Sequence, residues 1–180
     1  RGPVRLMSSR RGRLGTGRRD WLWVVTILVV GVVIAFGIVL ALSGGGSEPT
    51  IAGVKCERGE PEGYHIHTKL EILIAGQPFE VPGDVGRESS VCLYWLHTHD
   101  GQPGRIHVEA PSDRDFTLGQ FFAIWDQPLS STQLLDRTTD AVHQIRATVD
   151  GTPFEGDPAT IPLEDGALIK LEYGPPFAED

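Results

Sequence analysis

The sequence predicts an α+β protein, in which a single transmembrane helix precedes one small two-layer domain with a mixed sheet and one main helix on one face. Three observations support this prediction. A 22-residue stretch near the N-terminus has no charged residue. Segments that alternate apolar and polar residues, the pattern of half-buried strands, recur through residues 50–180. One amphipathic helical pattern interrupts them, and a sheet covered by a single helix forms two layers.

The uncharged stretch runs from Trp21 to Leu42 and meets the requirements of a membrane span. As a helix with a rise of about 1.5 Å per residue it measures about 33 Å, more than a hydrocarbon core of roughly 30 Å. Seven arginines precede it, so residues 1–20 are expected to form a basic cytoplasmic tail. A cleaved signal peptide is the alternative, disfavoured by the length of the apolar stretch and by the lack of a good cleavage site.

The remaining chain is expected to lie outside the cytoplasm of a single-pass cell-membrane protein. Residues 43–49 are rich in glycine and serine and are expected to form a flexible linker, with one extracytoplasmic domain at residues 50–180. After residue 20 the chain carries nine Lys and Arg against 23 Asp and Glu, so nucleic acid is not expected as a partner. Met7, the only methionine, is a natural translation start, which would leave residues 1–6 untranslated.

Cys56 and Cys92 are the only cysteines and fall on the expected oxidising side of the membrane. A pair of thiols in such a compartment normally forms a disulfide. Metal ligation by the two thiolates is the alternative, although neither cysteine belongs to a CxxC pair.

The domain's elements follow from hydrophobic periodicity and turn residues. Thr117 and Gln120 have the spacing of a capping box, and an apolar stripe follows them, so a helix is expected to begin there and to end before Pro128. Asp150-Gly151 predicts a hairpin turn. Period-2 alternation predicts strands at residues 65–74, 79–81, 92–98, 105–109, 144–149 and 167–173, with a short helical turn at residues 130–135.

The histidines are the most informative functional residues. Two His-x-His pairs lie in predicted strands, which places both members of each pair on one face. If the loop at residues 100–104 joins antiparallel neighbours, His97 lies opposite His107. Residues 65–81 and residues 92–109 would each form a hairpin. Should these two hairpins lie side by side, five imidazoles converge on the sheet face that the helix does not cover: His65, His67, His97, His99 and His107.

Imidazole is a preferred ligand of copper, zinc and nickel, so this cluster predicts a metal site. Asp100 is predicted to join the five histidines as a ligand, and Glu71 and Glu109 are further candidates for a carboxylate ligand or a hydrogen-bond acceptor behind the ligands. Without methionine in the domain, a thioether site for Cu(I) is excluded. The leading hypothesis is therefore binding or buffering of Cu(II) or Zn(II).

Two other functions remain open. The histidines would be structural if the domain were an accessory or assembly subunit with a membrane-protein partner. A metal-dependent enzyme would need an open coordination position beside a pocket. Because the chain has no nucleophile elbow, no phosphate-binding glycine loop and no HExxH motif, no catalytic residue is predicted, and an enzyme is the weakest of the three hypotheses.

The stretches YHIHTKLEILIAGQPFEVPGDVG, CLYWLHTHDGQPGRIHVEAP and FTLGQFFAIWDQPL resemble an uncharacterised family of bacterial and archaeal membrane-anchored extracytoplasmic proteins. Its members share an HIH strand, a C-x-YWLHTHD strand, a G-x-IHVE-x-P strand and a TLGQFF-x-IW helix. The resemblance covers residues 64–129 and implies a shared fold, without an activity to transfer. The closing run VDGTPFEGDPATIPLEDGALIKLEYG resembles the last strands of β-grasp (ubiquitin-like) domains, which implies a β-grasp-like sheet.

Overall fold

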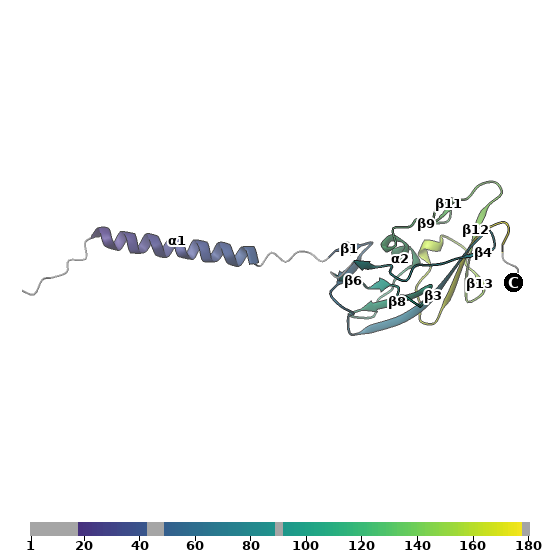
Figure 1. Ribbon diagram of the computed structural model, residues 1–180, viewed down its shortest axis with the longest axis horizontal. Helices are drawn as coiled ribbons and strands as arrows, with labels where there is room; N and C mark the ends of the chain where they lie inside the picture. Colours follow the sequence, from purple (N-terminus) through teal and green to yellow (C-terminus); the bar gives the residue numbers. More distant parts are fainter. Residues whose placement is uncertain (1–17, 43–48, 89–91, 178–180) are drawn as a thin grey trace, which may run out of the picture. The chain divides into compact units, whose positions relative to one another are not determined.

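The computed structural model describes residues 18–42, 49–88 and 92–177, and it divides into two compact units, Arg1–Ser47 and Glu48–Asp180. Helix α1 (Arg18–Leu42) belongs to the first unit (Figure 1). Among the residues described, no helix is both long and apolar enough to cross a membrane, which contradicts the predicted span at residues 21–42.

The largest sheet of the second unit contains seven strands in the order β13-β12-β14-β3-β8-β7, with β4 beside β3 (Figure 1). Strands β14 and β3 are parallel, whereas the other neighbours are antiparallel. The strands are β3 (Tyr64–Ile74), β4 (Gln77–Phe79), β7 (Leu96–His97), β8 (Arg105–Ala110), β12 (Gln144–Val149), β13 (Thr152–Pro153) and β14 (Leu168–Gly174).

Two smaller sheets complete the unit. One has the order β1-β2-β6-β5 and the other the order β11-β10-β9. Their strands are β1 (Thr50–Ile51), β2 (Val54–Glu57), β5 (Arg87–Glu88), β6 (Cys92–Tyr94), β9 (Leu129–Ser130), β10 (Gln133–Leu134) and β11 (Arg137–Thr138).

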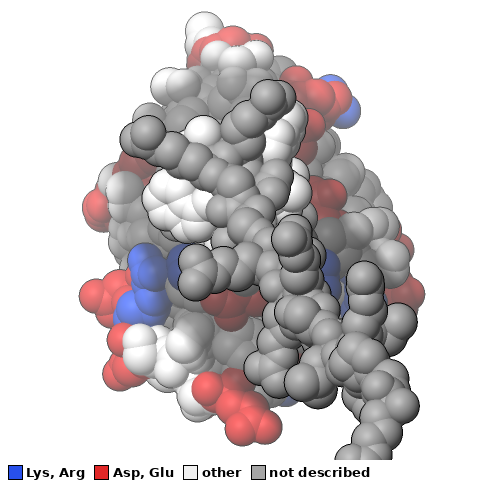
Figure 2. All heavy atoms as spheres, turned by 90° about the vertical axis from the view of Figure 1, so that its left-hand side faces the viewer, with Lys and Arg blue, Asp and Glu red and all other residues white. Residues whose placement is uncertain are grey.

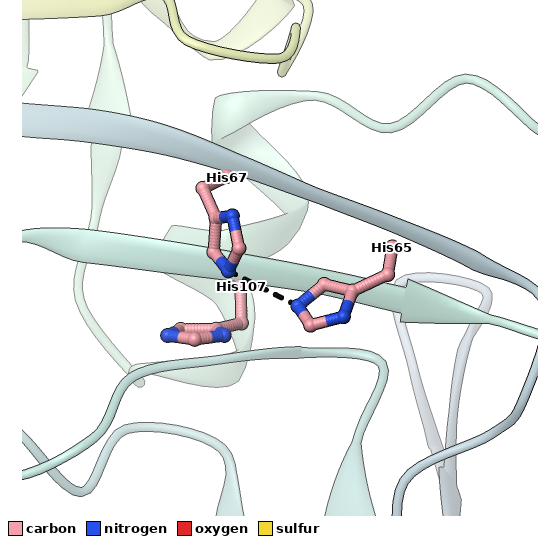
Figure 3. A group of neighbouring side chains, drawn as sticks. All are labelled: His65, His67 and His107. Atoms are coloured by element: carbon pink, nitrogen blue, oxygen red, sulfur yellow. Dashed lines mark hydrogen bonds between the residues drawn. The ribbon is translucent and has the colours of Figure 1, made fainter.

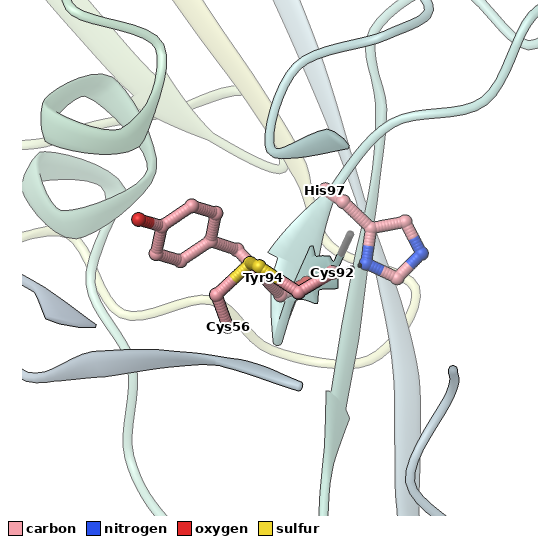
Figure 4. Close-up of a disulfide and its surroundings, with 4 residues drawn as sticks. All are labelled: Cys56, Cys92, Tyr94 and His97. Atoms are coloured by element: carbon pink, nitrogen blue, oxygen red, sulfur yellow. Dashed lines mark hydrogen bonds between the residues drawn. A yellow bond between two sulfur atoms is a disulfide. The ribbon is translucent and has the colours of Figure 1, made fainter. Parts of the chain in front are cut away.

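A disulfide between Cys56 and Cys92 joins β2 to β6, which confirms the predicted pairing. Strand β6 leads through one residue into β7, so the disulfide fixes the chain directly before His97. Figure 4 shows the disulfide beside Tyr94, whose ring points away from the His97 ring. The covalent bond therefore stabilises the connection between the small sheet and a histidine-bearing strand of the large one.

Helix α2 (Leu118–Ile124) begins after Thr117, whose backbone N–H donates to Gln120 Oε1 at 3.0 Å, as in a capping box. Its apolar residues Leu118, Phe121 and Phe122 are buried. The helix contacts β7, β1, β9 and the 3-10 turn η1 (Pro158–Thr160). The core below it includes alternate residues of the central strands, among them Leu70, Ile72, Ile106, Val108, Ile169 and Leu171.

The predicted α+β class, with a β-grasp-like domain and a main helix as a second layer, is wrong, because the described part of the second unit is mostly β-sheet. Its α-helix is limited to the seven residues of α2. Residues 130–135 belong to the β9–β10 hairpin rather than to a helical turn, and Leu135 has a left-handed φ of 54°. Residues 92–98 are divided between two sheets instead of forming one central strand.

Candidate metal centre

Strand β8 lies between β3 and β7 and carries the central histidine of the cluster. In the ladder registers His67 pairs with His107, and His107 pairs with His97, so three imidazoles lie in a row across three strands. This confirms the predicted pairing of residues 97 and 107. Gly104, with a φ of 69°, lets the loop before β8 approach the backbone of Leu70, whose N–H donates to the Gly104 carbonyl at 2.7 Å.

The first group of ligand atoms comes from His65, His67 and His107. The Nε2 atoms of His65 and His67 lie 3.0 Å apart, and the ring centroids of His67 and His107 lie 4.5 Å apart. Figure 3 shows the His107 ring next to the point where the other two rings meet. One nitrogen from each of the three lies within 4.8 Å of the others, close enough to hold one ion.

The second group comes from His97, His99 and, again, His107. The Nε2 atoms of His97 and His99 lie 3.1 Å apart. The His107 ring lies 5.3 Å from the His97 ring, nearly parallel to it, and 4.5 Å from the His99 ring. This group also has its ligand atoms within 4.8 Å of one another, so His107 connects the two groups.

Hydrogen bonds assign the protons of the second group. His97 Nδ1 lies 2.9 Å from the Tyr94 carbonyl, which can only accept, so Nδ1 carries the proton and Nε2 keeps its lone pair. A backbone acceptor on the far nitrogen is the usual way in which proteins orient a metal-ligating histidine. Arg87 Nη2 donates to His99 Nδ1 at 3.4 Å, which places the His99 proton on Nε2, facing His97.

Glu109 lies between the two groups and is 3 % exposed. Its Oε1 is 3.1 Å from His65 Nε2 and 3.6 Å from His107 Nδ1, and its Oε2 is 4.0 Å from His97 Nε2. Oε2 is buried and has no hydrogen-bond partner among the described residues. Glu60 adds a second carboxylate, with Oε1 3.8 Å from His99 Nε2, and forms a third ligand group with His97 and Glu109.

His107 is the most unusual residue of the cluster. It is 7 % exposed, and neither ring nitrogen has a hydrogen-bond partner among the described residues. A buried polar atom without a partner costs about 1–3 kcal/mol, so native proteins rarely keep one without a reason. An imidazole placed among four others, with no hydrogen bond to either nitrogen, has the chemistry of a ligand.

Burial keeps the central histidines neutral. It lowers the pKa of His97 to about 4 and, with the nearby histidines and Arg105 acting in the same direction, that of His107 to about 3. The pKa of His67 is lowered by burial and by Arg105. Burial also raises the pKa of the Glu109 carboxyl, to which Glu60 contributes. At neutral pH His67, His97 and His107 are therefore uncharged, and each has one ring nitrogen with a lone pair.

The stability of the metal-free protein is expected to fall as the pH is lowered from about 6.5 toward 4. In this range the unfolded chain binds protons at His97 and His107 that the folded protein does not, because their ordinary pKa of 6.5 is depressed on folding. Each group lowers the free energy of unfolding by at most about 1.4 kcal/mol per pH unit. The pKa of His67 is also lowered, which adds to the effect. Glu109, with its raised pKa, acts in the opposite sense, but it is one group against three.

Urea unfolding between pH 7.5 and 4.5 measures this dependence. A His107→Leu variant is the control and should show a shallower slope, because it lacks one of the histidines whose pKa folding lowers. A free energy of unfolding that stays constant between pH 7 and 5 in the wild type would contradict the burial of neutral imidazoles.

The structure brings together all five predicted histidines, but not all predicted carboxylates. Asp100 lies beside Gly83 and belongs to none of the ligand groups found among the described residues. Glu71 pairs in register with Lys170 on β14 instead. Glu109, named only as a further candidate, lies at the centre, and Glu60, which was missed, comes from a loop without a periodic pattern.

The sixth histidine is separate from the cluster. His143 Nδ1 contacts Asp140 at 3.0 Å, and its ring stacks on Tyr173. Its side chain is partly exposed and it belongs to no ligand group of the described residues. His143 is therefore a matched control for substitutions in the cluster.

A surface cavity of about 400 Å³ adjoins the first group, lined by His67, Thr68, Lys69, Gln102, Pro103, Arg105 and Gly166. Carboxylates predominate among the described charged side chains on the face in view in Figure 2, in line with the excess of Asp and Glu over Lys and Arg after residue 20. Such a surface raises the local concentration of cations.

Comparison of the chain with protein-family models, with curated proteins and with solved structures finds no match.

Proposed function

We propose that the protein binds a divalent transition-metal ion through His65, His67 and His107, with Glu109 as an oxygen ligand. The observation that carries the proposal is the burial of His107 among four other imidazoles, with no hydrogen bond to either of its ring nitrogens among the described residues. A metal–nitrogen bond would satisfy a polar atom that the metal-free protein leaves without a partner.

Two of the distances between the proposed ligand atoms already match those around a single ion. Zn²⁺ binds imidazole nitrogen at about 2.0–2.1 Å, so two ligands on a tetrahedral ion lie roughly 3.3 Å apart. His65 and His67 have their Nε2 atoms 3.0 Å apart, and Glu109 Oε1 is 3.1 Å from His65. The ion would replace the proton that His65 Nε2 shares with His67 Nε2 and Glu109 Oε1.

The donor set favours copper or zinc. Imidazole nitrogens suit Zn²⁺ and Cu²⁺, whereas Mg²⁺ and Ca²⁺ prefer all-oxygen sites. The buried carboxylate of Glu109 supplies negative charge next to the ion. Because the ligands come from neighbouring strands of one sheet rather than from a mobile loop, the site suits specific binding or buffering of such an ion.

We further propose that the second unit works outside the cytoplasm. Disulfides persist in oxidising compartments and are rare where glutathione keeps thiols reduced. The Cys56–Cys92 bond of this unit supports such a location.

Calorimetric titration of the full chain with Zn²⁺ and Cu²⁺ tests metal binding. A dissociation constant of about 1 µM or below, equivalent to roughly −8 kcal/mol, is expected. At a free-ion concentration 100-fold above that constant the folded state should gain about 2.7 kcal/mol in thermal or urea unfolding. His143→Ala should bind as the wild type does. Binding only in the millimolar range would contradict the proposal and favour structural histidines in an accessory subunit.

The cavity beside His67 favours metal-dependent catalysis as a second candidate function, since Lys69 and Arg105 could hold an anionic oxygen ligand there. The Co²⁺-loaded protein tests it. A change in the visible spectrum on addition of phosphate would support an exchangeable position on the ion. An unchanged spectrum would leave binding or buffering as the function.

A further inference from the structure

We propose that the centre holds two metal ions and that Glu109 bridges them, one through each carboxylate oxygen. This inference rests on the proposed metal binding and extends it from one ion to two. The two ions share Glu109 as a ligand and otherwise use separate side chains.

The number of donors exceeds what one ion can use. The three overlapping ligand groups together contain seven side chains, namely Glu60, His65, His67, His97, His99, His107 and Glu109. A four-coordinate ion uses four donor atoms. Two such ions need eight donors, which seven side chains supply if one carboxylate binds through both oxygens.

Glu109 has the geometry of that shared ligand. Its Oε1 faces His65 Nε2 at 3.1 Å and His107 Nδ1 at 3.6 Å, while its Oε2 faces His97 Nε2 at 4.0 Å. The two oxygens therefore point toward different histidine groups. Oε2 is buried and has no hydrogen-bond partner among the described residues, so the oxygen that faces the second group is still available.

The side chains divide into two sets of four donors. The first ion would take His65, His67, His107 and Glu109 Oε1. The second would take His97, His99, Glu60 and Glu109 Oε2, since Glu60 Oε1 lies 3.8 Å from His99 Nε2. His97 is already oriented for this role, because its Nδ1 donates to the Tyr94 carbonyl and its Nε2 faces the second set.

The two positions differ in the contacts that their ligands make before metal arrives. A proton lies between two Nε2 atoms in each set, with the atoms 3.0 Å apart in His65 and His67 and 3.1 Å apart in His97 and His99. Only in the second set does an arginine contact a ligand, with Arg87 Nη2 3.4 Å from His99 Nδ1. Binding there requires this contact to break as well as the proton to leave. The first set therefore fills before the second. Ions bridged in two-metal sites lie about 3.5–4 Å apart, close enough for strong magnetic coupling.

Electron paramagnetic resonance of the full chain, with the Cu²⁺ content measured by elemental analysis after dialysis, tests the inference. The wild type should retain two Cu²⁺ per chain. Its spectrum should show an isolated Cu²⁺ signal at one equivalent, and this signal should broaden or disappear at two equivalents as the ions couple. His143→Ala should behave in the same way.

Substitutions in each set give the second measurement. His65→Ala/His67→Ala and His97→Ala/His99→Ala should each retain one ion with an isolated signal. Retention of a single ion by the wild type, unaffected by His97→Ala/His99→Ala, would overturn the second ion and leave the proposed function intact. Two ions with uncoupled signals would overturn the bridge. A wild type that retains no ion would overturn both the two-ion centre and the proposed function. The wild-type titration decides the question even if a variant fails to fold.

Discussion

Replacement of His107 by leucine is expected to lower the affinity for Zn²⁺ or Cu²⁺ at least about 100-fold, without destabilising the metal-free protein. The loss of affinity follows because His107 is central to the cluster, and removal of groups that merely orient ligands already costs 10- to 100-fold. The stability should stay level or rise by about 1–3 kcal/mol, because leucine removes two buried nitrogens that have no hydrogen-bond partner.

A loss of metal affinity without a loss of folding stability distinguishes a ligand from a structural histidine. A structural residue contributes to stability, so its replacement would lower the free energy of unfolding and leave metal affinity unchanged. Titration and urea unfolding of the same preparations measure both, with His143→Leu as the control on a histidine outside the cluster. Lower stability with unchanged affinity in His107→Leu would favour the accessory-subunit alternative.

Removal of the disulfide is expected to destabilise the second unit by roughly 3–4 kcal/mol. The bond closes a sequence separation of 36 residues, and the chain-entropy model gives a value of this size for such a loop. Because β6 runs directly into β7, the loss should also weaken metal binding by the set that contains His97. Urea unfolding of Cys56→Ser/Cys92→Ser against the oxidised wild type measures the effect.

The wild type treated with a reductant is the matched control for this variant, since it lacks the bond but keeps the native residues. Both samples should unfold at a similar, lower urea concentration. A difference below about 1 kcal/mol between the oxidised and reduced wild type would show that the bond does not restrict the unfolded chain as expected.

The arrangement of the histidines could be predicted from the sequence because strand geometry determines it. Alternation places both members of a His-x-His pair on one face, and a short loop between antiparallel strands determines which residues face each other. These two rules were sufficient to pair His97 with His107. The same two rules could not predict that these histidines are buried. Their burial depends on segments that cover the histidine-bearing face of the sheet, such as the loop at Gly86, which approaches His97.

The remaining features depend on tertiary contacts that leave no periodic signal. Glu60 reaches the centre from an irregular segment, and Asp100, although adjacent to His99 in the sequence, lies against Gly83. The fold class was wrong for a similar reason. The strands β1, β5, β9, β10 and β11 have two residues each, too few for alternation to be recognised, and the one helix of the unit, α2, has only seven residues.

Anomalous X-ray diffraction from crystals loaded with Zn²⁺, measured above and below the zinc absorption edge, tests the central claim most directly. The strongest anomalous peak is expected about 2.0–2.1 Å from nitrogens of His65, His67 and His107, with Glu109 Oε1 as the fourth ligand. A strongest peak at surface carboxylates or at His143, with the cluster unchanged from its metal-free geometry, would contradict it.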